Sequence, residues 1–219
     1  MKYLRKFETE ADVKIFVQPN VALVADSKKI IYNAPMPSGA YIQHIDGSLY
    51  TADQWSANGF TSDAANGVAV IDERAKFVIA KTGGNGLVWA QNTSALIDGV
   101  FASPNQPQAE ADYAGDANTV LITAAGTGGA ASFCANFEFP NGAKGYLPAL
   151  GEWVVAYEYK ADITMLMSLV GSPVVENLHW SSTQSSSNKA WYFAWHSGNS
   201  ASGGKISTAY VRPFAPLSI

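Results

Sequence analysis

The 219-residue sequence has one cysteine, few charged residues and no long apolar run. A single cysteine, Cys134, cannot form a disulfide within the chain, which fits folding in a reducing compartment. No window approaches about 18 uninterrupted apolar residues, so membrane insertion is not expected. The net charge is −4 without any run of Lys or Arg, so electrostatic binding to nucleic acid or to an anionic membrane is disfavoured.

Hydrophobic residues make up 47% of the chain, which is enough to build a buried core. The first residues, MKYLRKFETEADVKIF, carry early positive charge but no continuous apolar stretch, so we expect no secretory signal. Display outside a cell would then follow folding in the cytoplasm, for example on a released virus particle.

Residues 1–37 predict a small helix-hairpin unit. Thr9 is a candidate N-cap, Pro19 ends the helix, and two β-rich runs at 21–24 and 30–32 indicate a hairpin. A helix and one hairpin bury too little core to be stable alone. We therefore expect this unit to pack on the main domain or on a partner chain, in an assembly role.

Residues 38–219 predict one α+β domain, because strands are followed by helices and then by strands again. Strands are expected at 41–45, 48–51, 67–72, 77–81 and 119–123, helices at 53–58, 130–137 and 148–169, and loop-rich β structure from residue 178 onward. Asp46-Gly47 between the first two strands is a strong turn signal. The absence of any repeat of about 20–50 residues disfavours a solenoid or a propeller.

The segment GTGGAA at 126–131 matches the GxGxxA pattern of a dinucleotide-binding fingerprint. It follows a predicted strand and opens a predicted helix, as that fingerprint requires. However, no second strand ending in Asp or Glu follows about 20 residues later. A plain Gly/Ala turn is therefore the favoured interpretation.

The histidines His44, His179 and His196 do not have metal-ligand spacing with one another or with the cysteine. His44 and His179 are read as structural or solvated, and His196 as a residue that could touch a ligand. Cys134 lies between two phenylalanines of a predicted amphipathic helix, which is more typical of a core thiol than of a nucleophile. We expect no catalytic residue and no enzyme activity.

Two carboxylate pairs, Glu138 with Glu152 and Asp112 with Asp116, are candidates for acid/base chemistry. Nothing in the sequence places either pair across a cleft, so solvated and helix-terminal charges are the favoured interpretation. A loop calcium near Asp112, Asp116 and Asn118 stays open, although no EF-hand pattern is present. We expect no resident metal and no cofactor.

Residues 180–217 contain Trp180, Trp191 and Trp195, separated by runs of small polar residues. Tryptophan can anchor a strand in a core, since each ring buries roughly 150–250 Å². The intervening segments, 185–188 and 196–204, are rich in Ser, Asn and Gly, the composition of antibody-like paratopes. Exposed loops that bind nothing would have the same composition.

A framework of short motifs surrounds these segments: GYLP at 145–148, EW at 152–153, WSST at 180–183, AW at 190–191 and VRPF at 211–214. It resembles the framework of C-type-lectin-fold variable proteins, which diversity-generating retroelements diversify, and the formylglycine-generating-enzyme-like branch of the lectin fold. The resemblance covers about residues 38–219 in order of elements and is strongest at 145–217. It implies a C-type-lectin-like fold with two helices and short antiparallel strands.

The resemblance also implies a variable ligand-binding segment at 180–210. Diversification changes adenines, typically in AAC codons, and the resulting codons never encode Trp, Lys, Gln, Glu or Met. Gln184 and the tryptophans are therefore framework, and Lys189 and Lys205 are treated likewise. The candidate ligand-binding residues are Ser185, Ser187, Asn188, Tyr192, Ala194, His196, Ser197, Asn199, Ser200 and Ser202.

The function that the resemblance implies is ligand or receptor binding by a display protein on a phage or prophage tail or on a cell surface. Its partners would be a host-surface protein or glycan and other tail or surface structural proteins, and it would form a homotrimer. An alternative is a structural tail-fibre or pilus component without a ligand of its own. A formylglycine-generating-type oxidase is disfavoured, because that chemistry resembles one that needs two active cysteines.

Overall fold

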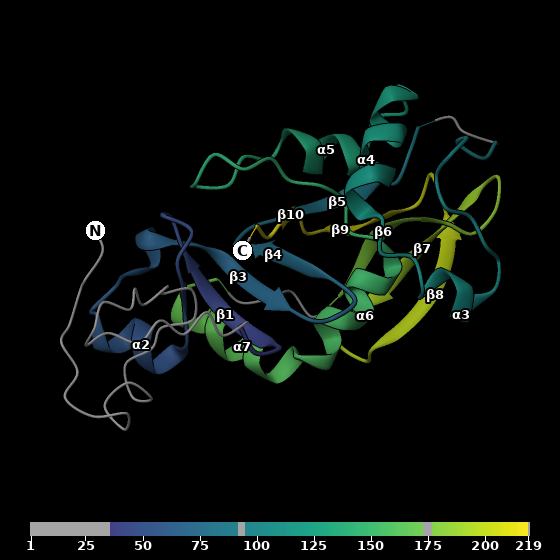
Figure 1. Cartoon of the computed structure of the whole chain (residues 1–219). Helices are drawn as coiled ribbons and strands as arrows, with labels where there is room; N and C mark the ends of the chain where they lie inside the picture. Colours follow the sequence, from purple (N-terminus) through teal and green to yellow (C-terminus); the bar gives the residue numbers. More distant parts are fainter. Residues whose placement is uncertain (1–35, 92–94, 173–176, 219) are drawn as a thin grey trace, which may run out of the picture.

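The computed structural model describes residues 36–91, 95–172 and 177–218 (Figure 1). Apart from its last two residues, the predicted N-terminal unit lies outside the described residues, so both that unit and its boundary stay predictions. Across the described ranges, no helix is both long enough and apolar enough to cross a membrane.

The described chain forms two five-stranded sheets, as expected for an α+β domain. The first sheet has the order β10 (Phe214–Pro216), β4 (Lys76–Ala80), β3 (Ala65–Ile71), β1 (Gly39–His44) and β2 (Leu49–Tyr50). The second sheet has the order β5 (Gly84–Val88), β9 (Thr208–Val211), β6 (Leu178–Gln184), β7 (Lys189–Ala194) and β8 (Asn199–Gly204). Neighbouring strands are antiparallel except β6 and β9.

The last strand returns to the first sheet. β10 pairs with β4, with Phe214 opposite Ile79, and the Ala80 backbone N–H donates to the Pro213 carbonyl at 3.0 Å. Residues 81–213 therefore form an insertion between two paired strands. The whole second sheet and most of the helices lie in this insertion.

The helices are α2 (Ala52–Ala57), α3 (Gln106–Ala109), α4 (Gly115–Ala124), α5 (Ala130–Asn136), α6 (Leu150–Glu158) and α7 (Lys160–Leu169), with a 3₁₀ turn at Ser62–Ala64. In Figure 1, α4 and α5 pack together on one side of the sheets, while α7 lies along β1 on the other side. The predicted elements at 41–51, 53–58, 67–81 and 130–137 are confirmed to within a few residues.

Residues 119–123, predicted as a strand, belong to helix α4. The prediction followed a run of β-branched residues, but the buried positions of α4 include Gly115, Asn118, Thr119 and Ile122, three or four residues apart. The hydroxyl of Thr119 donates to the Gly115 carbonyl at 2.7 Å, which satisfies it inside the helix. Tertiary packing therefore overrides the β propensity of this run.

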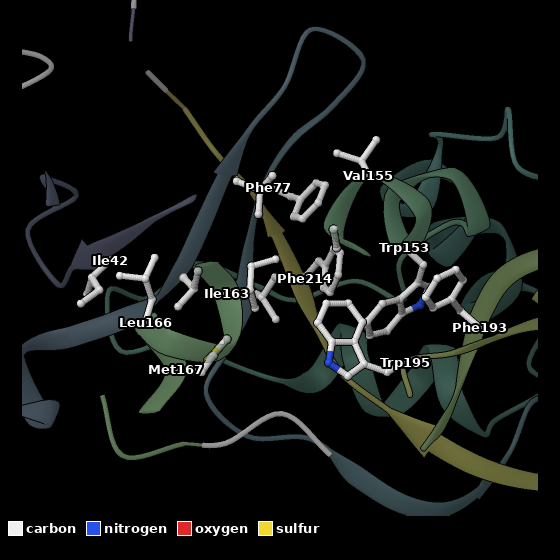
Figure 2. Close-up of a cluster of buried hydrophobic side chains, with 14 of the residues drawn as sticks. Ile42, Phe77, Trp153, Val155, Ile163, Leu166, Met167, Phe193, Trp195 and Phe214 are labelled. Atoms are coloured by element: carbon white, nitrogen blue, oxygen red, sulfur yellow. The ribbon is translucent and has the colours of Figure 1, made fainter. Parts of the chain in front are cut away.

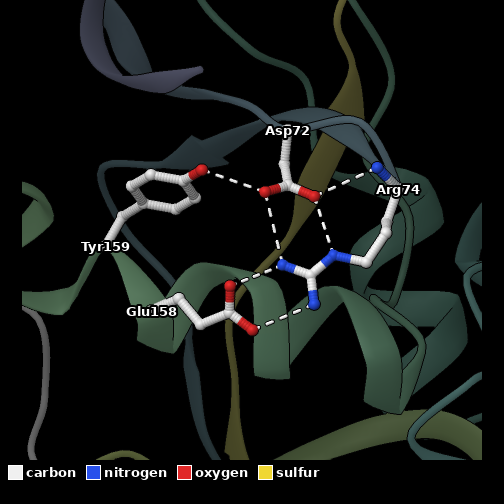
Figure 3. Close-up of polar contacts among 4 residues, drawn as sticks. All are labelled: Asp72, Arg74, Glu158 and Tyr159. Atoms are coloured by element: carbon white, nitrogen blue, oxygen red, sulfur yellow. Dashed lines mark hydrogen bonds and ion pairs between the residues drawn. The ribbon is translucent and has the colours of Figure 1, made fainter.

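The single helix predicted at 148–169 is two helices that meet at Tyr159. This residue has φ −102° and ψ 18°, ends α6 and begins α7. Its hydroxyl donates to Asp72 at 2.9 Å, and Arg74 bridges Asp72 and Glu158 (Figure 3). The β3–β4 turn thus holds the helix junction, and the Arg74 hydrogen bond lowers the pKa of Asp72 to about 2.

The main core gathers around Trp153 of α6 (Figure 2). Its ring lies parallel to Phe193 of β7 at 6.2 Å between centroids, 5.0 Å from Phe214 of β10, and 5.9 Å from Trp195. Since Phe193 and Phe214 belong to different sheets, Trp153 packs the two sheets against one helix. The predicted burial of Trp180, Trp191 and Trp195 is confirmed.

The GxGxxA segment connects two helices, α4 and α5, so the strand that precedes a dinucleotide fingerprint is missing. Its glycines have a backbone role. Gly126 and Gly129 have φ of 67° and 78°, a region that L-residues rarely occupy. A Cβ atom on Gly129 would also overlap the Val88 carbonyl oxygen, whereas nothing lies within 4 Å of one on Gly126.

These two glycines make a matched test of close packing. Gly126→Ala should cost about 1–2 kcal/mol of unfolding free energy, from positive φ alone. Gly129→Ala should cost about 2–4 kcal/mol, because α5 must also move away from β5. Urea unfolding of both variants measures the difference, and equal losses would mean that the contact of Gly129 with Val88 is unimportant.

Candidate functional site

The candidate ligand-binding residues do not form one surface. Ser185 and Ala194 are buried, with 8% and 6% of their surface exposed, so they contribute nothing to an exposed face. The Ser185 backbone N–H donates to the Lys189 carbonyl in the β6–β7 turn, and Ala194 pairs with Leu178 of β6. Both residues are held by the sheet rather than displayed, in contrast to the sequence-based expectation.

Strand alternation divides the candidates in the β7–β8 hairpin between two faces. Tyr192 lies opposite Ala201, whereas Ser200 and Ser202 lie opposite Phe193 and Trp191, on the other face of the sheet. The segment predicted as a loop at 196–204 is mostly strand β8, and this introduces the alternation. Consecutive residues of such a segment cannot all contact one ligand.

The partly buried candidates Ser200 and Tyr192 also contact other residues of the chain. The hydroxyl of Ser200 donates to Glu110 at 2.7 Å, which ties β8 to the end of α3. Tyr192 packs edge-on against Trp180 at 5.8 Å and covers Gly203, where a Cβ atom would lie 3.1 Å from the ring. Substitution of Tyr192 would therefore disturb packing as well as any ligand contact.

The exposed candidates occupy two turns at opposite ends of β7. Ser187 and Asn188 lie in the β6–β7 turn, while His196, Ser197 and Asn199 lie at the β7–β8 turn. A six-residue strand separates them by roughly 20 Å, since each residue adds about 3.3 Å. The residues 196–199 are the more continuous group, and we name them the hairpin tip.

The hairpin tip stands on a fixed base. Gly198 has φ 75°, and its N–H donates to the Ala194 carbonyl at 2.8 Å. A Cβ atom on Gly198 would overlap the ring of Tyr157 in α6, so the turn lies directly on this ring. The Lys160 ammonium donates to the Trp195 carbonyl at 2.8 Å and lies 5.3 Å from the centre of the Tyr157 ring. Exposed side chains therefore project from an anchored backbone.

Tyr157 and Lys160 were not identified from the sequence as supports of the site. They precede the hairpin tip by about 40 residues and lie in an amphipathic segment that indicated only a helix. The distance in sequence leaves no local signal. Only the packing of α6 against β7, with α7 following α6 in contact with it, brings them under the turn.

Gln184 and Lys205, which the sequence assigned to the framework, contact each other and other parts of the scaffold. The Gln184 side-chain oxygen accepts from the Lys205 ammonium at 2.7 Å and from the Ile97 N–H at 2.9 Å. Lys205 also lies 4.8 Å from the centre of the Trp89 ring, and burial lowers its pKa to about 8. Lys189, by contrast, is exposed.

Asp112 has a structural role among buried polar groups. One of its oxygens accepts from Asn118 at 2.9 Å and from the Thr183 hydroxyl at 2.7 Å, and Thr183 in turn accepts from the Leu150 N–H at 2.9 Å. These contacts join α4, β6 and the start of α6. Within the described residues, no group of three His, Cys, Asp or Glu side chains could hold a metal ion.

The remaining candidate chemistry is dispersed. His179 is buried against Trp153 at 4.9 Å, and His44 packs on Phe60 at 4.9 Å. Cys134 is fully buried, which raises the pKa of its thiol and confirms it as a core residue. Glu138 is exposed and pairs with Lys144 at 2.6 Å.

Glu152 is the exception, because its carboxyl is buried beside a cavity of 350 Å³. One oxygen accepts from the Tyr146 hydroxyl at 2.8 Å and the other from the Ala149 N–H at 2.7 Å. Burial raises the pKa of Glu152 to about 8, aided by the charges of Asp112 and Asp116 and opposed by the two hydrogen bonds. The group is therefore largely protonated at neutral pH.

A raised carboxyl pKa makes stability depend on pH. Because Glu152 holds its proton more tightly when folded than at its ordinary pKa of 4.5, its contribution is complete below pH 4.5 and is lost as pH rises through about 8. The loss should approach at most about 1.4 kcal/mol per pH unit. Urea unfolding across this window should show the decline in the wild type and in Glu138→Gln, and a much flatter profile in Glu152→Gln. An unchanged slope in Glu152→Gln would exclude Glu152 as the source.

Comparison with known proteins gives one informative likeness. No protein-family model matches the chain, and its sequence matches no curated protein. The fold is similar to the crystal structure of a fimbrial protein from Bacteroides ovatus ATCC 8483, with a TM-score of 0.63 and 14% sequence identity. The match covers 82% of this chain and 48% of that chain, so this chain spans about half the length of its structural neighbour. At this identity, the likeness shows a shared fold alone.

Proposed function

We propose that this chain is a ligand-binding display protein whose recognition surface is the hairpin tip, residues 196–199. The main observation behind this proposal is an exposed polar turn whose backbone contacts Tyr157 and accepts a hydrogen bond from Lys160. Binding sites commonly place variable side chains on loops that a rigid scaffold positions.

The chemistry of the tip suits recognition of varied partners. His196, Ser197 and Asn199 offer both donors and acceptors and are exposed. Changes at such positions typically alter the unfolding free energy by within about 0.5 kcal/mol. A host-surface protein or glycan is the proposed ligand, and a phage or prophage tail or a cell surface is the proposed place of display. Association with other structural proteins and a homotrimer stay predictions.

The finer fold assignment, a C-type-lectin-like domain of the retroelement-diversified type, belongs to this proposal. It is supported by the burial of the tryptophans at 180, 191 and 195 and by the contacts of the WSST motif with α4 and α6. The order of strands, helices and strands agrees with it. Variation would then affect ligand contact at exposed positions only, because Ser185 and Ala194 are buried.

A second candidate function is structural: a fimbrial or pilus component without a ligand of its own. The likeness to a fimbrial protein favours it. An oxidase of the formylglycine-generating type is not proposed, because Cys134 is the only cysteine in the sequence and is fully buried.

Two variants test the leading proposal. The tip variant replaces His196, Ser197 and Asn199 by Ala, and the control variant replaces Ser187 and Asn188 in the opposite turn by Ala. Both should keep nearly the wild-type melting temperature, because all five side chains are exposed. A glycan array and a whole-cell binding screen, run with the wild type and both variants, measure recognition.

Binding that is lost in the tip variant and kept in the control variant is the expected result. Binding lost only in the control variant would move the recognition surface to the β6–β7 turn. If the wild type binds neither glycans nor cells, the structural candidate is favoured. A large fall in the melting temperature of the tip variant would show that these residues stabilise the fold.

A further inference from the structure

The cavity beside Glu152 is separate from the hairpin tip and lies where three parts of the fold meet. The β3–β4 turn, the first turn of α4 and strand β10 form its rim, and Tyr146 and Glu152 line its buried floor. Gly115 makes room for the floor, because a Cβ atom there would overlap the Glu152 carboxyl. The cavity is open to solvent above this floor, and its volume of 350 Å³ is at the lower end of the size range of small-molecule sites.

The charges around the cavity favour a neutral ligand. The rim carries Lys76 and Asp116, one charge of each sign. The Arg74 guanidinium, also on the rim, is already paired with Asp72 and Glu158 (Figure 3). An anion would meet Asp116, and a cation would meet both Lys76 and the positive end of α4. The floor adds no charge at neutral pH, since Glu152 is largely protonated.

The same walls can both donate and accept hydrogen bonds. Each Glu152 oxygen accepts one hydrogen bond, which leaves acceptor capacity, and the protonated carboxyl also carries a donor. On the rim, the N-cap residue of α4 is Ala114, whose side chain cannot cap the first-turn N–H groups of Asp116 and Ala117. Hydroxyl groups suit this mixture because they donate and accept together. Tyr113 and Pro216 supply apolar surface for C–H groups.

We propose that this cavity binds a neutral, polyhydroxylated ligand the size of one monosaccharide. This site shares no residue with the hairpin tip, so a test of one proposal does not decide the other.

Sugars with the same type of ring and different charges test the proposal directly. The probes are D-glucose, D-galactose and D-mannose as neutral hexoses, D-glucuronate as the anion and D-glucosamine as the cation. Titration of the full chain by amide NMR at about pH 6 keeps both Glu152 and glucosamine protonated. At least one neutral hexose should shift the amides of Asp116 and Ala117 with a roughly millimolar Kd. Its charged relatives should bind about fivefold more weakly.

Substitutions locate the site. Ala117→Trp should fill the cavity and abolish the hexose shifts, whereas Ala124→Trp, at an exposed position of α4 outside the cavity lining, should leave them unchanged. Lys76→Met removes the positive charge of Lys76 without filling the cavity, so it should strengthen glucosamine binding relative to glucuronate binding. The tip variant should bind the hexose as the wild type does.

Three results would overturn the proposal. They are the absence of shifts at Asp116 and Ala117 with every neutral hexose, equal binding of the neutral and charged rings, and hexose binding that survives in a folded Ala117→Trp. If Ala117→Trp does not fold, an unchanged preference between glucosamine and glucuronate in Lys76→Met counts against the site.

Discussion

The packing of Trp153 is the interaction on which the other parts of the molecule depend. Its ring contacts Phe214 of the first sheet and Phe193 of the second, so a single indole fixes the spacing of both sheets from α6. The same helix carries Glu152 at its start and Tyr157 near its end. The floor of the cavity and the base of the hairpin tip are therefore placed by one helix, whose position the aromatic core sets. Truncating a buried tryptophan of this kind typically costs roughly 3–5 kcal/mol.

Hydrogen bonds between buried polar groups then hold in place segments that the aromatic core does not fix. Thr183 contacts both Asp112 and the start of α6, and Gln184 binds the loop at 95–100 together with Lys205. Each group would be costly to bury alone, and each is satisfied by a partner far away in sequence. These hydrogen bonds explain how long segments with few apolar residues adopt one conformation.

The sequence allowed prediction of features that follow from local pattern: the Asp46-Gly47 turn, the helix at 130–137 and the burial of the three C-terminal tryptophans. The α4 segment was mistaken for a strand, since its β-branched run is a local signal that long-range packing overrides. The candidate site was only partly predictable. Codon and composition rules select residues one at a time, whereas strand alternation and burial, which put Ser185 inside and Ser202 on the second face, depend on pairing. Tyr157 and Lys160 could not be predicted as supports of the hairpin tip, because no local sequence pattern marks them.

The pairing of β10 with β4 has a consequence for biosynthesis. Until residues 214–216 have left the ribosome, β4 is the edge of its sheet, and its apolar strand FVIA has backbone groups without a partner on that side. Such an edge can pair with other nascent chains. Contacts between strands so far apart in sequence also form slowly. Completion of the first sheet therefore waits until residues 214–216 have emerged, and a chain truncated before residue 214 would keep an unpaired edge that is prone to aggregation, however well its insertion folded.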